Sequence, residues 1–274
     1  MKLARTIGLV MGLLSLLGGA VARGDLVFST QPRGPYAKVG PAFEQVADYL
    51  SKVSGEKVVY RHFGDWISYS AAIRNDDLDI VFDGPQFVAW RLAYRTHTLV
   101  AMLPPSDATH IVVVKKDNSA IAQVKQLAGR TVCGRPPPNL ASLELLREFD
   151  NPARVPFIVE VDGYEGAYRG LMQGKCAAAL MSNTVYEKLD KDARAARVVF
   201  TSERKLPPGG FTVGRGIAPE ARAKIGKALT SPDAAKAIKA FLDDYSKGRA
   251  LAEPRPEEYK GVENLLKGEF GFEP

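Results

Sequence analysis

The order of strands and helices constrains the fold of this chain most strongly, because the same order occurs twice. Short apolar runs alternate with segments of helical periodicity over residues 25–94, and the alternation starts again at residue 131. Short loops join these segments, which is typical of α/β folds whose strands are connected by crossover helices. The expected strands are 25–29, 57–61, 78–82, 99–103, 111–114, 131–133, 156–161, 176–181 and 198–201. The expected helices are 36–54, 66–74, 86–94, 140–149, 165–173, 183–189, 219–229 and 232–245.

The segment after the last expected strand indicates how the two halves are joined. Residues 206–213 (LPPGGFTV) break the alternation, and the two helices that follow have no further strands to cover. We therefore expect these helices to pack on the first half, so that the second half is an insertion. Two chain crossings between the lobes would form a hinge. The predicted boundaries are 23–111 with 209–274 for the first lobe and 112–208 for the inserted second lobe.

The N-terminal segment indicates export. Lys2 and Arg5 precede an uncharged apolar stretch that ends in Ala20-Val21-Ala22, the small-x-small pattern read by signal peptidase. We expect residues 1–22 to be a signal peptide and the mature protein to be periplasmic. An uncleaved membrane anchor is the alternative, but the run is shorter than the roughly 20 apolar residues of a comfortable span.

The distribution of charge argues against a nucleic-acid partner. The formal net charge of +6 becomes +4 once Lys2 and Arg5 are removed, and charges of both signs are interspersed along the rest of the chain. Nucleic-acid binders usually carry a basic stripe, and this sequence has none. A basic pocket for a small anion remains compatible with this pattern.

The two cysteines, Cys133 and Cys176, both lie in the part expected to be exported. An even number of cysteines in an oxidising compartment suggests a disulfide. Two buried free thiols are one alternative, and soft ligands for a metal or metalloid are another. Neither cysteine has a histidine at ligand spacing, so we predict no zinc or other metal site and no cofactor.

Polar residues that follow the expected strands are the candidate ligand contacts, because ligands bind beyond the carboxyl ends of strands in open parallel sheets. The helix expected to begin near Tyr36 would point its amide groups at an anion. Asp83 can accept a hydrogen bond from a ligand or cap the next helix. Tyr69 can form a wall of the pocket or pack in the core. The predicted ligand-binding residues are Tyr36, Tyr69, Asp83, Gln86, Asn139, Ser142, Tyr164, Ser182 and Asn183.

Catalytic motifs are missing from the sequence. It contains no G-x-S-x-G, H-E-x-x-H, Walker A or G-x-G-x-x-G pattern. The three histidines, His62, His97 and His110, do not lie beside a candidate nucleophile in the sequence. His110 opens a crossing strand, where packing or hydrogen bonding suits it better than catalysis. We therefore predict a binding protein with no catalytic residues, and a periplasmic enzyme is the rival from another class.

Several stretches, in their order and spacing, resemble one protein family. They are 77–87 (DLDIVFDGPQF), 110–116 with 127–132, 174–179 (GKCAAA) and 207–212 (PPGGFT). Over about residues 27–259 the chain is similar to the phosphate/phosphite/phosphonate-type periplasmic solute-binding proteins of ABC transporters. The resemblance implies a type II periplasmic-binding-protein fold, with two lobes and two crossover hinge strands. It also implies that a small polar or anionic ligand is captured between the lobes.

The same resemblance suggests the partners. An ABC transporter permease would receive the ligand from a monomeric binding protein, and a membrane histidine kinase that senses ligand occupancy is the alternative partner. Relatives that bind phosphonates carry a Ser/Thr-rich turn at the first helix of the second lobe. Here that stretch is 136–142 (PPPNLAS), in which Ser142 alone resembles the pattern. Some relatives bridge the matching strands of the second lobe with a disulfide, and one type uses cysteine to sense arsenite.

Overall fold

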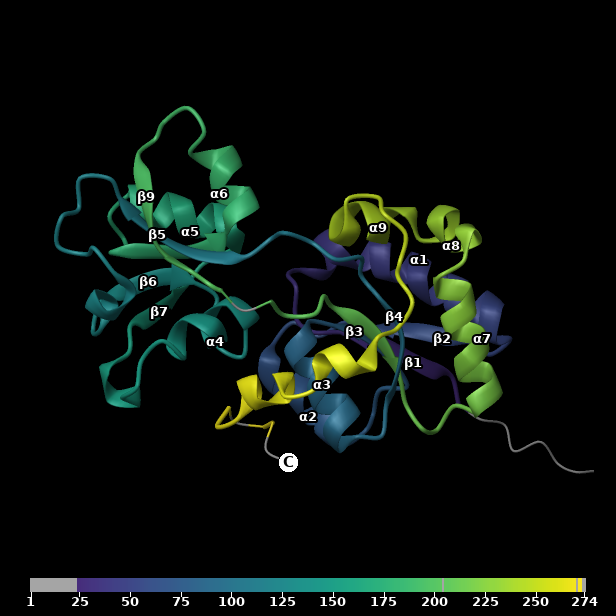
Figure 1. Ribbon diagram of the computed structural model, residues 1–274. Helices are drawn as coiled ribbons and strands as arrows, with labels where there is room; N and C mark the ends of the chain where they lie inside the picture. The colour runs from purple at the N-terminus through teal and green to yellow at the C-terminus, as the bar shows by residue number, and fades with distance from the viewer. Residues whose placement is uncertain (1–23, 204, 270, 273–274) are drawn as a thin grey trace, which may run out of the picture.

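The computed structural model describes residues 24–203, 205–269 and 271–272, and it has two lobes, each built around a five-stranded sheet (Figure 1). The predicted signal peptide lies outside the described residues. Lobe 1 contains β1 (Leu26–Thr30), α1 (Tyr36–Ser54), β2 (Val58–Arg61), α2 (Trp66–Arg74), β3 (Ile80–Asp83), α3 (Pro85–Tyr94), β4 (Thr98–Met102), β10 (Gly210–Val213), α7 (Pro219–Leu229), α8 (Pro232–Ala237) and α9 (Lys239–Ser246). Two 3₁₀ helices, η3 (Pro256–Tyr259) and η4 (Val262–Leu266), complete lobe 1.

Lobe 2 repeats the architecture of lobe 1. It contains β5 (His110–Lys115), η1 (Val124–Leu127), β6 (Thr131–Gly134), α4 (Leu140–Leu146), η2 (Pro152–Arg154), β7 (Phe157–Glu160), α5 (Gly163–Met172), β8 (Ala178–Ser182), α6 (Asn183–Leu189) and β9 (Ala196–Thr201). The strand order is β2-β1-β3-β10-β4 in lobe 1 and β7-β6-β8-β5-β9 in lobe 2. Helices cover the faces of both sheets, as expected for an α/β fold (Figure 1).

Each sheet is mixed, and the chain crossings explain why. Four strands of each sheet run in one direction and one runs against them, because β10 pairs antiparallel with β3 and β4, and β5 pairs antiparallel with β8 and β9. Both β5 and β10 are the strands that the chain enters directly after crossing from the other lobe. The sequence predicted parallel crossovers, because its periodicity carries no information on the direction of a strand that arrives from a different sheet.

The two crossings lie side by side and form the connection between the lobes. Residues 103–109 lead from β4 to β5, and residues 202–209 return from β9 to β10. The amide of Leu103 donates to the carbonyl of Gly209 at 2.8 Å, and the amide of Ser202 donates to the carbonyl of His110 at 2.8 Å. The crossings are therefore hydrogen-bonded to each other at both ends.

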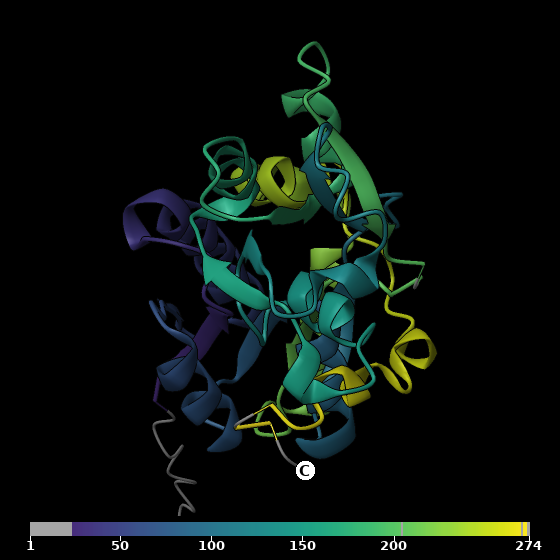
Figure 2. The same ribbon diagram turned by 90° about the vertical axis from the view of Figure 1, so that its left-hand side faces the viewer.

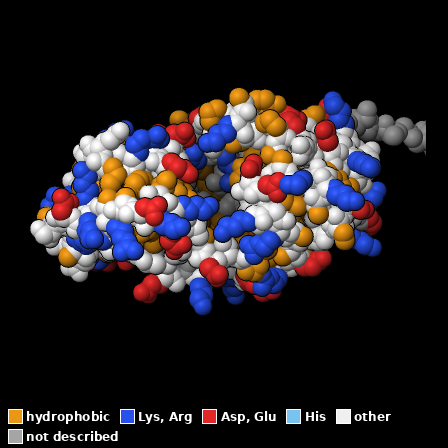
Figure 3. Space-filling model, turned by 90° about the horizontal axis from the view of Figure 1, so that it is seen from above, with side chains coloured by type: hydrophobic (Ala, Val, Ile, Leu, Met, Phe, Trp, Pro, Cys, Tyr) orange, Lys and Arg blue, Asp and Glu red, His pale blue; other side chains and the backbone are white. Residues whose placement is uncertain are grey.

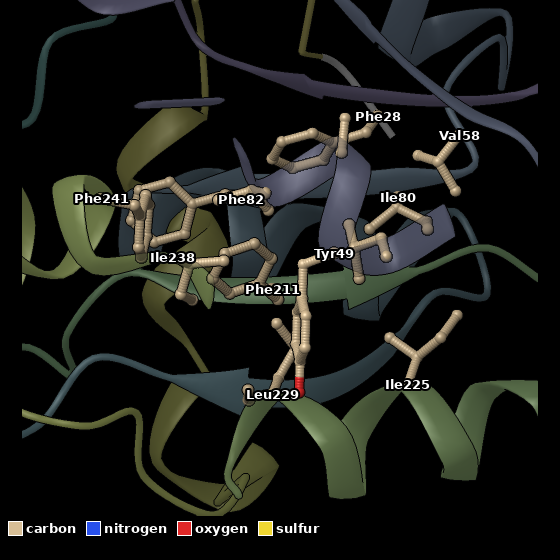
Figure 4. Close-up of a cluster of buried hydrophobic side chains, with 14 of the residues drawn as sticks. Phe28, Tyr49, Val58, Ile80, Phe82, Phe211, Ile225, Leu229, Ile238 and Phe241 are labelled. Atoms are coloured by element: carbon tan, nitrogen blue, oxygen red, sulfur yellow. The ribbon is translucent and has the colours of Figure 1, made fainter. Parts of the chain in front are cut away.

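The core of lobe 1 on the α1 side of its sheet is rich in phenylalanine (Figure 4). Phe82 from β3 and Phe241 from α9 meet edge to face, with ring centroids 4.7 Å apart. Phe211 from β10 lies 4.9 Å from Phe82. Aromatic contacts at these separations stabilise a core beyond the area that they bury. The strand that returns from lobe 2 is therefore anchored in the centre of lobe 1.

The C-terminal segment packs on α3 and also reaches lobe 2. Leu143 of α4 belongs to the same buried cluster as Val262 and Leu265 of η4. A guanidinium nitrogen of Arg147 donates to the carbonyl of Asn264. Figures 1 and 2 show the yellow C-terminal segment passing beside α4. No helix in the part of the chain that the structure describes is long and apolar enough to cross a membrane.

Cys133 and Cys176 form a disulfide in lobe 2. The S–S distance is 2.01 Å, and the two Cα atoms are 5.6 Å apart. Cys133 lies on β6 and Cys176 just before β8, the parallel neighbour of β6. Gly170 of α5 permits this arrangement, because a Cβ there would lie 2.6 Å from the sulfur of Cys133. The structure thus has the predicted disulfide, and the two sulfur atoms are not thiol ligands for a metal or metalloid.

Candidate ligand-binding cleft

A cleft of about 370 Å³ lies between the two lobes. Figure 3, seen from above, shows a hollow between the lobes with Lys and Arg side chains on both sides. Most of the lining residues lie at or just after the carboxyl ends of strands in both lobes, where a sheet of this kind presents its ligand site. Lobe 1 contributes Gln31, Arg33, Gly84, Gln86 and Tyr245, and lobe 2 contributes His110, Gly134, Arg135, Asn139, Leu140, Ala141, Gly163, Tyr164, Glu165 and Leu180.

Arg33 supplies a guanidinium group to the lobe 1 side of the cleft. Its carbon centre lies 4.9 Å from the ring centroid of Phe82 and 4.8 Å from that of Tyr245. Its Nε donates to the hydroxyl of Thr30 at 2.9 Å. Burial raises the pKa of Tyr245, although the positive charges of Arg33 and Arg135 act to lower it. Arg33 is therefore oriented by two rings and one hydrogen bond, beside a neutral tyrosine hydroxyl.

Arg135 supplies a second guanidinium from lobe 2. It follows β6, and a terminal nitrogen donates to the backbone carbonyl of Arg33 at 3.4 Å. Asp162 lies 3.9 Å from this guanidinium, but its side chain is 82% exposed. An exposed pair at that distance is strongly screened by water, so Asp162 neutralises little of the charge. Guanidinium groups from opposite lobes thus face the same cleft.

Gln86 connects the two lobes from the start of α3. The residue is fully buried, and its Nε2 donates to the carbonyl of Pro138 at 3.2 Å. A carbonyl only accepts hydrogen bonds, so this contact fixes which end of the amide is the nitrogen. Its Oε1 is buried and has no hydrogen-bond partner among the described residues. This oxygen is an acceptor at the cleft wall that a bound molecule or water can satisfy.

A buried ionic network lies beneath the cleft in lobe 1. The carboxylate of Asp83 is 2.5 Å from a guanidinium nitrogen of Arg91, and it accepts from the hydroxyl of Tyr69. It also accepts from the backbone amide of Gln31 at 2.8 Å, which fixes the loop that carries Arg33. The Nε of Arg91 donates to the hydroxyl of Thr212 on β10 at 2.9 Å. Burial and the charge of Asp83 raise the pKa of Tyr69 well above 10, so its hydroxyl stays a donor.

His97 is packed against this network, and it makes the stability of the native protein depend on pH. Burial, and secondly the charge of Arg91, lower the pKa of His97 to about 3. Its Nε2 lies 3.4 Å from the carboxylate of Asp76, whose side chain is 37% exposed. Solvent screens that exposed carboxylate, so it does not offset the cost of charging the buried ring. The native state therefore holds His97 neutral across the physiological range.

We expect acid to destabilise the native protein through His97. Between pH 6.5 and pH 3 the unfolded ring binds a proton that the folded ring does not, so stability falls as the pH falls. The loss is about 1.4 kcal/mol per pH unit. Urea titrations at pH 7.5 and 5.0 should show a loss in wild type about 2 kcal/mol larger than in His97→Asn. Equal losses in both proteins would contradict the assignment, and pH 8.5 serves as the control because both forms of the ring are neutral there.

Three of the nine predicted ligand residues line the cleft, namely Gln86, Asn139 and Tyr164. Asn139 caps α4, because its side chain accepts from the amide of Ala141 at 3.2 Å. Burial raises the pKa of the Tyr164 hydroxyl to about 12. Contact of these three side chains with a ligand stays a prediction.

The other six predicted residues do not line this cleft, and their contact with a ligand also stays a prediction. Asp83 and Tyr69 belong to the buried network, and Tyr36 is 49% exposed with its hydroxyl bonded to Glu44. Ser142 is buried and donates to the backbone carbonyl of Arg135. The hydroxyl of Ser182 is 2.9 Å from that of Thr184, and the side chain of Asn183 accepts from the amide of Thr109 at 3.0 Å.

Sequence reasoning left out Arg33, Arg135, His110, Glu165 and Tyr245, all of which line the cleft. Arg33 and Arg135 each follow a predicted strand, so their position was a signal, but an arginine in a loop is as typical of a solvated surface. Tyr245 had no such signal, because it lies on a C-terminal helix far along the chain from the strands of the cleft.

Comparison with known proteins identifies the family. The family profile described as "ABC transporter, phosphonate, periplasmic substrate-binding protein" matches residues 28–259. The chain belongs to this family. It is therefore a periplasmic binding protein that captures a small molecule and works with an ABC transporter. None of the curated protein sequences compared matches this binding protein.

Solved structures show the fold of this binding protein. PhnD1 from Prochlorococcus marinus in complex with methylphosphonate has a TM-score of 0.68 at 16% identity, over 88% of this chain and 97% of that chain. XAC2383 from Xanthomonas citri bound to ATP has a TM-score of 0.67 at 17% identity, over 90% and 96%. A binding protein component of an ABC phosphonate transporter (PA3383) from Pseudomonas aeruginosa has a TM-score of 0.66 at 14% identity, over 88% and 84%. The predicted type II periplasmic-binding-protein fold is thus confirmed.

Proposed function

We propose that this protein binds a small oxyanion, of the alkylphosphonate or phosphate type, between its lobes and delivers it to an ABC transporter permease. The observation that carries the proposal is that Arg33 from lobe 1 and Arg135 from lobe 2 line one cleft. We further propose that the protein is exported by residues 1–22 as a signal peptide, acts as a monomer and performs no catalysis.

The two guanidinium groups explain why binding of an anion would favour closure of the lobes. Like charges from opposite lobes repel each other, and this repulsion opposes closure while the cleft holds no anion. An oxyanion between them accepts from both planar forks, which match phosphonate and carboxylate geometry. The ligand then has higher affinity for the closed state than for the open state, and that difference drives closure.

The proline-rich turn of lobe 2 changes how the oxyanion is recognised. Residues 136–138 are prolines, which have no backbone N–H to donate. The hydroxyl of Ser142, which resembled the phosphonate-binding pattern, is bonded to the backbone carbonyl of Arg135. We infer that the arginines supply the donors that relatives take from a hydroxyl-rich turn.

The size of the cleft suits a small molecule. Its volume of about 370 Å³ lies near the lower end of the range of ligand pockets, about 300–1,000 Å³. Leu140, Ala141 and Leu180 provide an apolar part of the wall. An oxyanion that carries a short organic substituent would use both the arginines and this apolar surface.

The test is a binding and closure experiment on the mature protein. Isothermal titration and thermal unfolding would be measured with methylphosphonate and inorganic phosphate, and X-ray scattering would follow the radius of gyration. A ligand at 100 times its dissociation constant should stabilise the protein by about 2.7 kcal/mol and reduce the radius. Dimethyl sulfone, which is small and uncharged, is the control. The proposal is wrong if neither anion alters the unfolding temperature or the radius.

A further inference from the structure

His110 occupies a position that its hydrogen bonds set apart from the other cleft residues. It is the first residue of β5, where the first crossing enters lobe 2, and it lines the cleft. Its Nδ1 is hydrogen-bonded to the carboxylate of Glu144 on α4. The other oxygen of that carboxylate accepts from the hydroxyl of Ser202 at 2.5 Å. One imidazole nitrogen is therefore committed to a side chain of lobe 2.

The environment of Glu144 determines which nitrogen of His110 remains for the cleft. Glu144 is only 3% exposed, and a buried carboxylate requires hydrogen-bond donors to offset its lost hydration. His110 and Ser202 supply these donors, so Nδ1 carries a proton and Nε2 is left on the other side of the ring. Carboxylates fix the orientation of ligand-binding histidines in this way, and a second proton, on Nε2, turns that nitrogen into a donor.

The same residues join the two crossings between the lobes. The carbonyl of His110 accepts from the amide of Ser202 at 2.8 Å, and the hydroxyl of Thr109 donates to the carbonyl of Ser202 at 2.8 Å. His110 is thus the residue at which the incoming crossing is hydrogen-bonded to the returning crossing. A group that binds its ring therefore contacts the hinge itself. The Arg33 and Arg135 side chains do not lie on either crossing.

We propose that Nε2 of His110 binds the oxyanion in the cleft and that Glu144 is the positioning residue that aims it. This inference rests on the proposed function. Tyr164 faces His110 with ring centroids 6.4 Å apart, and Arg135 and Glu165 line the same part of the cleft. With a proton on each ring nitrogen, the imidazolium donates from Nδ1 to Glu144 and from Nε2 to the oxyanion. It adds a third donor to the two guanidinium groups, and it connects the bound ligand directly to the hinge.

Two substitutions separate the roles of the two ring nitrogens. In His110→Asn the amide nitrogen takes the place of Nδ1, so the contact with Glu144 is kept and the donor to the cleft is lost. In His110→Gln the amide nitrogen reaches the place of Nε2, so the donor to the cleft is kept. We expect His110→Asn to weaken methylphosphonate binding by about 10- to 100-fold, which corresponds to one hydrogen bond to a charged group. His110→Gln should bind more tightly than His110→Asn.

The unfolding temperature of the ligand-free variants shows that they remain folded. A second measurement needs no variant: the ¹⁵N chemical shift of Nε2 of His110 should move on saturation with methylphosphonate, while that of Nδ1 stays nearly constant. Only three histidines have to be assigned. If wild type binds and His110→Asn binds equally well, or if the Nε2 signal does not move, this inference is overturned and the proposed function stands. If wild type binds neither methylphosphonate nor phosphate, both are overturned.

Discussion

Replacing Arg33 with Gln is expected to weaken methylphosphonate binding by about 30- to 1,000-fold. Removing one member of a buried, hydrogen-bonded charge pair costs about 2–4 kcal/mol, because the charge of the other member is left without its partner. Arg33 is held by Thr30 and by the rings of Phe82 and Tyr245, so little reorganisation is needed before it binds an anion. The dissociation constant from isothermal titration at fixed ionic strength measures the effect.

Lys57→Gln is the matched control, because it removes one positive charge from the same lobe at a surface pair with Asp25. We expect its dissociation constant to stay within about twofold of wild type, since exposed charges are screened. Arg33→Lys keeps the charge and loses the planar fork, so it should fall between wild type and Arg33→Gln. Equal affinities for Arg33→Gln and Lys57→Gln would contradict recognition by the cleft arginines.

The alternation of strands and helices was sufficient to predict both lobes, because each element carries its own periodicity. It missed details that depend on tertiary contacts. The expected helix 232–245 is divided into α8 and α9 at Ile238, whose backbone leaves the helical conformation with φ −118° and ψ 35°. The apolar side chain of Ile238 is fully buried in the core of lobe 1, so it fits the apolar periodicity of one continuous helix. The sequence pattern therefore does not reveal the break. The short 3₁₀ helices η3 and η4 have too few residues for a periodic signal.

The candidate site was harder to predict than the fold, because a polar residue that follows a strand can either line the cleft or form a buried structural contact. Gln86 and Asp83 lie three residues apart and are both fully buried, yet the first lines the cleft and the second does not. The difference depends on Arg91, which lies five residues after Gln86 on α3 and whose guanidinium contacts Asp83. A single sequence shows that Arg91 is present, but it does not show that its side chain points into the protein.

Asp83→Asn is expected to reduce the free energy of unfolding by about 3–5 kcal/mol. The carboxylate is fully buried, and its main ionic partner, Arg91, is only 1% exposed. Without the negative charge, the guanidinium of Arg91 is left buried and uncompensated. The loop of Gln31 also loses a charged acceptor for its amide. Urea unfolding of the ligand-free protein measures the loss.

The double variant Asp83→Asn/Arg91→Met tests the reason for that loss. It removes both charges, and we expect it to recover part of the stability, because no uncompensated charge remains in the core. A role of Asp83 as a ligand contact predicts the opposite pattern, in which Asp83→Asn unfolds like wild type and loses affinity alone. Because the network fixes the loop that carries Arg33, we expect weaker methylphosphonate binding to accompany the loss of stability. The ligand-free unfolding curve therefore decides whether Asp83 supports the cleft from below or belongs to its binding surface.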